Sequence, residues 1–229
     1  MRTLKTTLLA GLVTATVGIA GSASATLLTF DLDNIGNFVV IDQNYGDRVT
    51  GLTDAVGSYG ELGEGFTANV VSDFGTVDPS LWTTGYSGLT NVFFDDADNQ
   101  GPLELVLTAD AGFNVQLFDF DLGAFGANRT VNSVRVTNES NVVLFESLGD
   151  TILGATHSDY TFSSPLVGQS LRITIDQTNL GSASDDVALD NVRFGQIDNV
   201  TAPVPEPATM TLLGMGIAAM AARSRRRKA

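Results

Sequence analysis

Apolar and polar residues alternate along most of the chain between its two ends, and this period of two constrains the fold more than any other feature. The clearest examples are residues 28–32, 133–137 and 171–176. A strand points successive side chains to opposite faces, so this alternation is typical of β-strands with one buried face. Further segments of this kind, separated by clusters of Gly, Asn and Asp, are 38–41, 65–71, 91–94, 103–108, 113–125, 142–146, 158–163 and 186–195.

The region from residue 26 to residue 196 shows no sustained helical period with capping residues. About ten short strands without helices predict an all-β fold of two packed antiparallel sheets, a jelly-roll-like β-sandwich. A region of this length is enough for one domain with a proper hydrophobic core.

Two of the expected strands change the phase of their alternation. In one, the buried set passes from Leu117 to Phe120, and a β-bulge of one residue would return both side chains to the same face. In the last strand, Leu189 and Val192 are out of phase in the same way. If the phase of Val192 governs, Asp190 points into the sandwich, where a carboxylate must be paired, hydrogen-bonded or bound to a metal.

The N-terminus has the pattern of a secretory signal peptide. Met1, Arg2 and Lys5 give a positive start, residues 8–20 are apolar, and Ala23-Ser24-Ala25 supplies a small-x-small cleavage pattern. The sequence therefore predicts a signal helix over residues 1–25, export through the Sec translocon, and a mature chain that begins at Thr26. A permanent N-terminal membrane helix is the alternative, although the apolar run is short and interrupted by glycines.

The C-terminus, residues 205–229, combines three features in a fixed order. Pro205-Glu206-Pro207 comes first, and 15 apolar or small residues, 208–222, follow. At ~1.5 Å per residue this run spans about 22 Å, less than the ~30 Å hydrocarbon core of a bilayer. Fixed positive charge after an apolar run stays on the cytoplasmic side. The sequence predicts a short transmembrane helix, preceded by a linker at 197–204 and stopped by the basic cluster of Arg223, Arg225, Arg226, Arg227 and Lys228.

This tail resembles the PEP-CTERM sorting signal of Gram-negative bacteria, through VPEPATMTLLGMG at 204–216 and RSRRRKA at 223–229. The resemblance implies processing by an exosortase, a membrane enzyme that acts near Pro-Glu-Pro and passes the body to the cell surface or the exopolysaccharide matrix. Pro205, Glu206 and Pro207 would then be substrate residues, and the inner membrane a transient anchor. A permanent inner-membrane anchor is the alternative.

The body between the two terminal segments is strongly acidic. Residues 26–204 contain five arginines, no lysine and 25 acidic residues, a net charge of −20. Binding a phosphate backbone needs clustered cations, so nucleic acid is excluded as a partner. Divalent cations or a hydrated matrix suit this charge better, and plain solubility of an exported protein is the alternative.

The segment DDVALDNVRFG, 185–195, resembles the closing strand of domains that precede PEP-CTERM tails and, more loosely, that of jelly-roll carbohydrate-binding modules. In such modules the first Asp of this strand often helps to hold a structural calcium ion. The resemblance assigns that role to Asp190, with Asp31 and Asp33 as co-ligands, although the usual early glutamate is missing. A hydrogen-bonded structural Asp190 is the alternative.

The residues needed for most forms of catalysis are missing. The chain contains one histidine, His157, and no cysteine, so neither a Ser-His-Asp nor a Cys-His arrangement is indicated. Paired carboxylates for glycoside hydrolysis remain open, because their test is a separation in space. We therefore expect a protein that is not an enzyme, with a secreted glycan-active hydrolase as the alternative.

Sugar binding is the function that the sequence favours. Aromatic rings that remain exposed can stack on pyranose faces, and Trp82 and Tyr86 stand in a segment rich in Gly and Thr. Tyr45, in Asn-Tyr-Gly-Asp, is a third candidate. Anchoring of the loop by Trp82 on the core is the alternative. The chain is thus expected to be an exported protein of the cell surface, biofilm or extracellular matrix that binds glycan.

Overall fold

The computed structural model describes residues 25–32, 36–49, 67–97 and 101–199. Residues 1–24 of the predicted signal peptide, Asp33 and the whole C-terminal tail, with the predicted transmembrane helix, lie outside these residues. Within them, no helix has the length and apolar character to cross a membrane.

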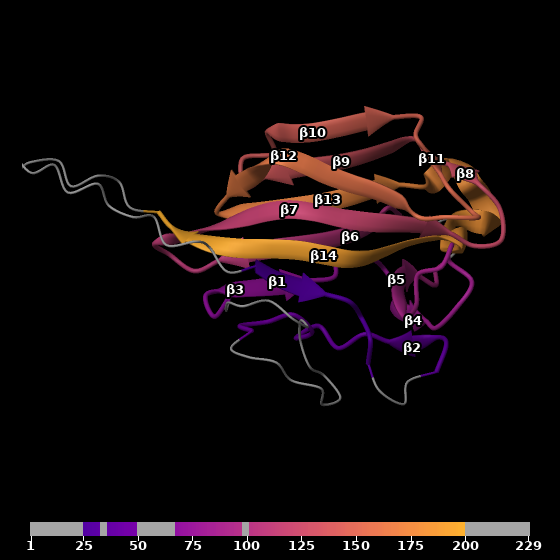
Figure 1. Ribbon diagram of the computed structural model, residues 1–229, viewed down its shortest axis with the longest axis horizontal. Coiled ribbons are helices and arrows are strands. Elements are labelled where there is room, and N and C mark those ends of the chain that lie inside the picture. The colour runs from indigo at the N-terminus through magenta and orange to yellow at the C-terminus, as the bar shows by residue number, and fades with distance from the viewer. Residues whose placement is uncertain (1–24, 33–35, 50–66, 98–100, 200–229) are drawn as a thin grey trace, which may run out of the picture.

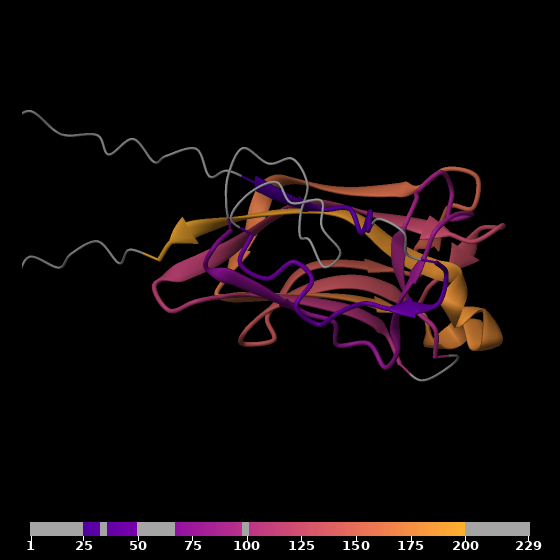
Figure 2. The ribbon, with the colours of Figure 1, turned by 90° about the horizontal axis from the view of Figure 1, so that it is seen from below.

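Two antiparallel sheets lie face to face and form the body of the protein (Figures 1 and 2). This arrangement confirms the predicted all-β sandwich. The larger sheet runs β12-β7-β14-β5-β4-β2, and β1 also pairs with β14. Its strands are β1 (Ala25–Leu28), β2 (Val39–Val40), β4 (Pro79–Trp82), β5 (Val92–Asp95), β7 (Phe113–Ala124), β12 (Ser158–Gly168) and β14 (Val187–Asp198).

The smaller sheet has five strands in the order β10-β9-β13-β6-β3. Two short strands, β8 (Arg129–Thr130) and β11 (Thr151–Ile152), pair separately. A 3-10 segment, η1 (Thr178–Asp186), precedes β14. The strands of the smaller sheet are β3 (Val70–Asp73), β6 (Leu103–Ala109), β9 (Ser133–Asn138), β10 (Val143–Leu148) and β13 (Ser170–Asp176).

The core fills the space between the sheets and is made by the apolar phase of each strand. In β6 and β13 every second residue is fully buried, so these strands keep strict alternation. Burial of apolar side chains stabilises such a sandwich by about 25 cal/mol per Å² removed from water. The buried apolar residues contributed by β6 and β13 are Leu103, Leu105, Leu107, Ala109, Leu171, Ile173 and Ile175.

The bulge predicted in β7 is present. Leu117 pairs with Phe194 and Asp119 with Arg193, which leaves Phe118 as the extra residue between them. As a result Leu117 and Phe120 both lie in the core. A matching irregularity in β14 lies between Asp190 and Arg193.

Some segments differ from the expectation. The segment that contains Trp82 was expected to be a loop, but Trp82 ends strand β4. Strand β1 begins at Ala25, the last residue of the predicted signal peptide, and β14 continues to Asp198, beyond the predicted boundary at 196. Because Ala25 pairs with Gly195, both ends of the described body lie at the same end of the sandwich (Figure 2).

Candidate functional site

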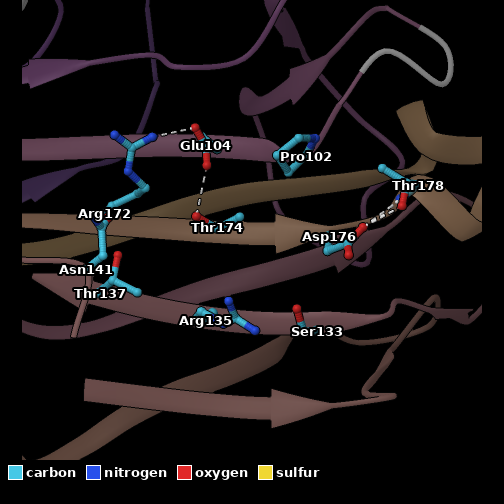
Figure 3. A pocket seen from close by; sticks show the side chains of 10 residues that line it. All are labelled: Pro102, Glu104, Ser133, Arg135, Thr137, Asn141, Arg172, Thr174, Asp176 and Thr178. Carbon is cyan, nitrogen blue, oxygen red and sulfur yellow. Dashed lines mark hydrogen bonds and ion pairs between the residues drawn. The ribbon is translucent and has the colours of Figure 1, made fainter. Parts of the chain in front are cut away.

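The outer face of the smaller sheet carries a broad basin with a volume of about 510 Å³ (Figure 3). It lies over β6, β13 and β9, on the polar phase of the same alternation that fills the core. The lining residues are Pro102, Glu104, Ser133, Arg135, Thr137, Asn141, Arg172, Thr174, Asp176 and Thr178.

The strand register brings these side chains into rows. Thr174 pairs with Glu104 of β6 on one side and with Arg135 of β9 on the other. Arg172 pairs with Thr137 in the next row. Directly opposed residues have Cβ atoms about 4.5–5.5 Å apart, so residues distant in the sequence meet on one face.

Hydrogen bonds fix the orientation of the long side chains. The Arg172 guanidinium donates to Glu104 Oε2 at 2.8 Å, and the Thr174 hydroxyl donates to Glu104 Oε1 at 3.1 Å (Figure 3). Arg135 donates through Nε to Glu146 Oε1 at 2.9 Å. Each guanidinium carries five N–H donors, so both keep donors beyond these contacts.

Asp176 closes one end of the basin as a well-supported acceptor. Its Oδ1 accepts bonds from the Thr178 hydroxyl at 2.6 Å and from Asn132 Nδ2 at 3.2 Å. Partial burial acts to raise the pKa of Asp176, but these hydrogen bonds outweigh it and lower the pKa. A carboxylate held in its ionised form accepts hydrogen bonds well and is a poor general acid.

A second polar cluster crosses the outer face of the larger sheet. Asp121 on β7 pairs with Asp190 on β14 and with Asp159 on β12, so three carboxylates stand in one row. Ligand atoms of Asp121, His157 and Asp159 all lie within 4.8 Å of one another. His157 lies directly before β12 and pairs through Nε2 with Asp159 Oδ1 at 3.0 Å.

Asp190 is the most perturbed acid of this row. It does not point into the sandwich: its partner Asp121 lies opposite in phase to the core residues Phe120 and Leu122, so Asp190 faces outward. It is nevertheless only 3% exposed. Burial, with the nearby carboxylates of Asp31 and Asp121, raises the pKa of Asp190 to about 9, against the lowering effect of a bond from the Asn191 N–H.

The aromatic residues predicted as sugar platforms have different positions. Tyr45 is buried and its hydroxyl oxygen accepts a bond from the Phe30 N–H at 2.8 Å. Tyr86 is buried and its hydroxyl donates to the carbonyl oxygen of Asp185. Neither ring has a face open to solvent, so neither is the exposed platform expected from the sequence. Trp82 stays half-buried, and a role in glycan binding remains a prediction for it alone.

Asp31 lies near enough to Asp190 for its charge to raise the pKa of Asp190, and so does Asp121, which the sequence did not single out. The calcium-binding role of Asp190 and Asp31 stays a prediction. The sequence pattern that could have indicated Asp121 is Phe-Asp-Phe-Asp-Leu at 118–122, in which the acidic residues alternate with apolar ones and so face outward. The polar basin was missed entirely, because Glu104, Arg135 and Arg172 are neighbours only through strand pairing.

Comparison with known families identifies one segment of the chain. Residues 203–227 match the family described as the PEP-CTERM protein-sorting motif. The predicted sorting motif Pro205-Glu206-Pro207 lies inside this match. The motif supports export of the chain and its processing by an exosortase. No curated protein matches the chain.

Two solved structures are similar to parts of the body. One is the family 32 carbohydrate-binding module of NanJ from C. perfringens in complex with galactose, with 13% identity and a TM-score of 0.35 over 56% of this chain and 95% of that one. The other is an arabinose-bound α-L-arabinofuranosidase, with 11% identity and a TM-score of 0.33 over 76% of this chain and 32% of that one. Both scores are too low for either likeness to carry an argument about this protein.

Proposed function

We propose that this chain is a non-enzymatic protein of the cell surface or exopolysaccharide matrix, and that its jelly-roll-like sandwich binds glycan through the polar basin of the smaller sheet. The observation that carries the proposal is the basin itself. Its volume lies within the range of about 300–1,000 Å³ that is usual for ligand sites. Glycans present many hydroxyl groups, each able to donate and to accept.

The lining of the basin suits such a ligand. Donors come from Arg135 and Arg172, and acceptors come from Glu104 and Asp176, with the short side chains of Thr137 and Thr174 between them. The long side chains are already held by their neighbours, which lowers the entropy lost on binding. Because the basin extends over three strands, we expect it to bind several units of a polymer and not a single enclosed sugar.

The basin also favours binding over hydrolysis. Glycoside hydrolysis needs one carboxyl group that is protonated near neutral pH and acts as general acid. In the basin, the pKa of Asp176 is lowered and Glu104 is engaged by both Arg172 and Thr174. A hydrolase remains the alternative, and release of reducing ends from the host exopolysaccharide would establish it.

The variant Arg172→Gln tests the proposal. Hydrogen bonds to charged groups contribute about 1.5–3 kcal/mol, so loss of the guanidinium is expected to weaken glycan binding by roughly ten- to a hundredfold. Binding can be measured on a glycan array and by isothermal titration with the exopolysaccharide of the host.

Arg48→Gln is the matched control, since Arg48 also pairs with an acidic residue, Asp110 at 2.6 Å, but lies outside the basin. Equal affinity of wild type and Arg172→Gln, with loss of binding in Trp82→Ala, would move the glycan site to the aromatic residues and refute the basin.

A structural calcium ion at Asp190 is the second proposal. Asp190, Asp121 and Asp31 supply oxygen ligands of the kind that calcium prefers. All five arginines of the body pair with other acids, so none of these three carboxylates forms an ion pair with a described arginine. A bound cation would offset the burial of charge and the repulsion from Asp31 and Asp121, which together favour protonation of Asp190. Asp33, the third predicted ligand, lies outside the described residues.

Calcium is therefore expected to raise the melting temperature. At a hundredfold excess over Kd the ion adds about 2.7 kcal/mol, or roughly 5–10 °C in a domain of this size. Asp190→Asn should abolish the shift, whereas Asp73→Asn, an exposed position in β3, should preserve it. An unchanged melt of the wild type in EDTA would remove the calcium proposal.

A further inference from the structure

A small aromatic pocket lies on the outer face of the larger sheet, on the opposite side of the sandwich from the polar basin. Leu81 and Phe93 point into the core, and their neighbours Trp82 and Phe94 therefore face outward. The cavity has a volume of about 100 Å³. It is lined by Phe38, Trp82, Tyr86, Phe94, Phe125, Asp185 and Asp186.

The rings meet at steep angles around Trp82. The centroid of its ring system lies 4.7 Å from that of Phe38 and 5.7 Å from that of Phe125, with interplanar angles of 88° and 74°. Phe94 lies 6.0 Å away at 89°. Rings that stand nearly perpendicular to one another form walls that face in several directions, whereas stacked rings would close the space between them.

Two of these aromatic side chains are left partly in solvent. Phe38 is 55% exposed and Phe125 is 39% exposed. Apolar rings that stay exposed beside a preformed hollow are typical of a ligand site. The buried indole N–H of Trp82 also has no hydrogen-bond partner among the described residues, so the pocket is not completed by the chain around it.

The pocket carries negative charge at one side. Asp186 is held in place by Arg129, whose Nε donates to Asp186 Oδ2 at 2.8 Å. Burial, and then the carboxylates of Asp185, Asp186 and Asp96, raise the pKa of the Tyr86 hydroxyl. Tyr86 therefore stays neutral. Asp185 and Asp186 form an acidic wall on this side of the pocket, and Arg129 compensates part of its charge through Asp186.

Size and chemistry together select the ligand. A water molecule takes about 30 Å³, and a dry cavity of about 150 Å³ binds benzene, so a pocket between these sizes takes a group of a few heavy atoms. A pyranose ring is too large. A hard metal cation needs oxygen ligands on most sides, which ring walls do not offer. An alkylated ammonium group suits aromatic faces, through cation–π attraction, and the acidic wall as well.

We propose that this aromatic pocket binds an N-methylated ammonium group. The group would lie against the rings of Trp82, Phe38 and Phe125, with its charge toward Asp185 and Asp186. The proposal is independent of glycan binding, since it uses the other face of the sandwich. The same chemistry occurs in free choline-type compounds and in phosphatidylcholine headgroups, and the experiment separates these two sources.

The chain offers its own reporter, because Trp82 is its single tryptophan. Choline is titrated into the exported mature protein while the fluorescence of Trp82 is recorded. A saturable change is expected. The neutral alcohol in which a tert-butyl group replaces the trimethylammonium group has nearly the same shape, and it is expected to bind at least about threefold more weakly because it lacks the cation–π term.

Two variants locate the effect. Phe38→Leu and Phe125→Leu remove one ring each from the exposed rim, and each is expected to weaken choline binding by about three- to thirtyfold. Phe118→Leu is the control, because its ring lies elsewhere, 5.4 Å from the Arg193 guanidinium carbon. Thermal melts of all three variants show that each one is folded.

Vesicles distinguish the sources of the ligand. Co-sedimentation with phosphatidylcholine but not with phosphatidylglycerol vesicles would assign a lipid headgroup, and binding of choline without vesicle binding would assign a soluble or polymer-borne amine. Three results would overturn the proposal: no saturable fluorescence change, equal affinity for the neutral alcohol, or full affinity in both rim variants.

Discussion

Asp190 lies on an outer sheet face and is nevertheless buried, so its carboxyl group behaves differently from one on an open surface. It lies on the outer face of its sheet, in a row with Asp121 and near the carboxylate of Asp31, and it is only 3% exposed. Burial without an ion pair favours the neutral acid. The sequence indicated that this residue needs compensation, and it could not indicate which neighbours supply it.

The pKa of Asp190 makes stability depend on pH in calcium-free protein. The folded-state pKa is about 9 and the ordinary value is 3.8. Between these values the native state holds a proton that the unfolded chain has lost, so unfolding becomes easier as the pH rises, by up to about 1.4 kcal/mol per pH unit. Urea unfolding in EDTA from about pH 5 to about pH 8 should show this fall.

Asp190→Asn removes the titrating group and keeps the shape, so its stability should change much less over the same range. The variant should therefore exceed the wild type in stability at the alkaline end. If both proteins show parallel pH profiles, Asp190 is already ionised in the folded protein and the burial argument is wrong.

The paired irregularities in β7 and β14 are the main departure from regular structure at the level of elements. Phe118 is the extra residue in β7, and Asn191 in β14 has a φ of 50°. Asparagine tolerates this left-handed conformation better than most residues. Its side chain also donates to Asp121 Oδ2 at 2.8 Å, so one residue connects the bulge to the carboxylate row.

Substitutions at Asn191 test whether the backbone conformation matters. Asn191→Gly and Asn191→Ala both lose the bond to Asp121, but only glycine accepts a positive φ freely. We expect Asn191→Ala to be less stable than Asn191→Gly by about 1–2 kcal/mol. Chemical unfolding of both variants measures the difference. Equal stability would mean that the strand can relax and that the left-handed residue is not required.

Alternation predicted the long strands well because period two reports directly on a sheet with one buried face. β6 and β13 follow it without a break. β4 was missed for a physical reason: Pro79, Ser80 and Leu81 are all buried, so no polar phase marks the strand, and a proline normally argues against one. The same error placed Trp82 in a loop and so exaggerated the exposure of its ring.

At the scale of the whole molecule, the acidic charge of the body is compatible with export by the sorting motif. The five arginines of the body each pair with an aspartate or a glutamate, so the excess of acidic groups is left to set the field around the protein. A net charge of this size favours solubility. The sorting motif at 203–227 is thus attached to a domain suited to a hydrated exterior.

Removal of residues 203–229 tests the role of the tail. The truncated chain should be exported and remain in the periplasm, since nothing retains it for the exosortase. A second variant, Pro205→Ala with Glu206→Ala and Pro207→Ala, keeps the apolar run and should accumulate in the inner membrane with its C-terminus intact. Fractionation and the C-terminal mass of each product measure this. Equal delivery of the truncated chain to the matrix would contradict exosortase-dependent sorting.

The sorting tail could be read from the sequence because its information is contiguous: a short motif, an apolar run and a basic end. The candidate sites of the body could not, because each depends on contacts between distant strands. Glu104 and Arg172 form one ion pair across 68 positions, and Phe38 meets Trp82 only through the pairing of β2 with β4. The register between paired strands decides which side chains become neighbours, and this register is established only when the sheet forms.

The position of β14 has a mechanical consequence. This strand leads toward the tail, and its ladder is bonded on one side to β7 and on the other to β1 and β5. A pull on Asp198 along the strand acts first on the hydrogen bonds to β7 and, from Gly195 onward, on those to β1 as well. Such a pull shears the ladders and does not open them one bond at a time. A domain attached through this end would resist mechanical unfolding under flow, and the outer faces of both sheets would stay accessible.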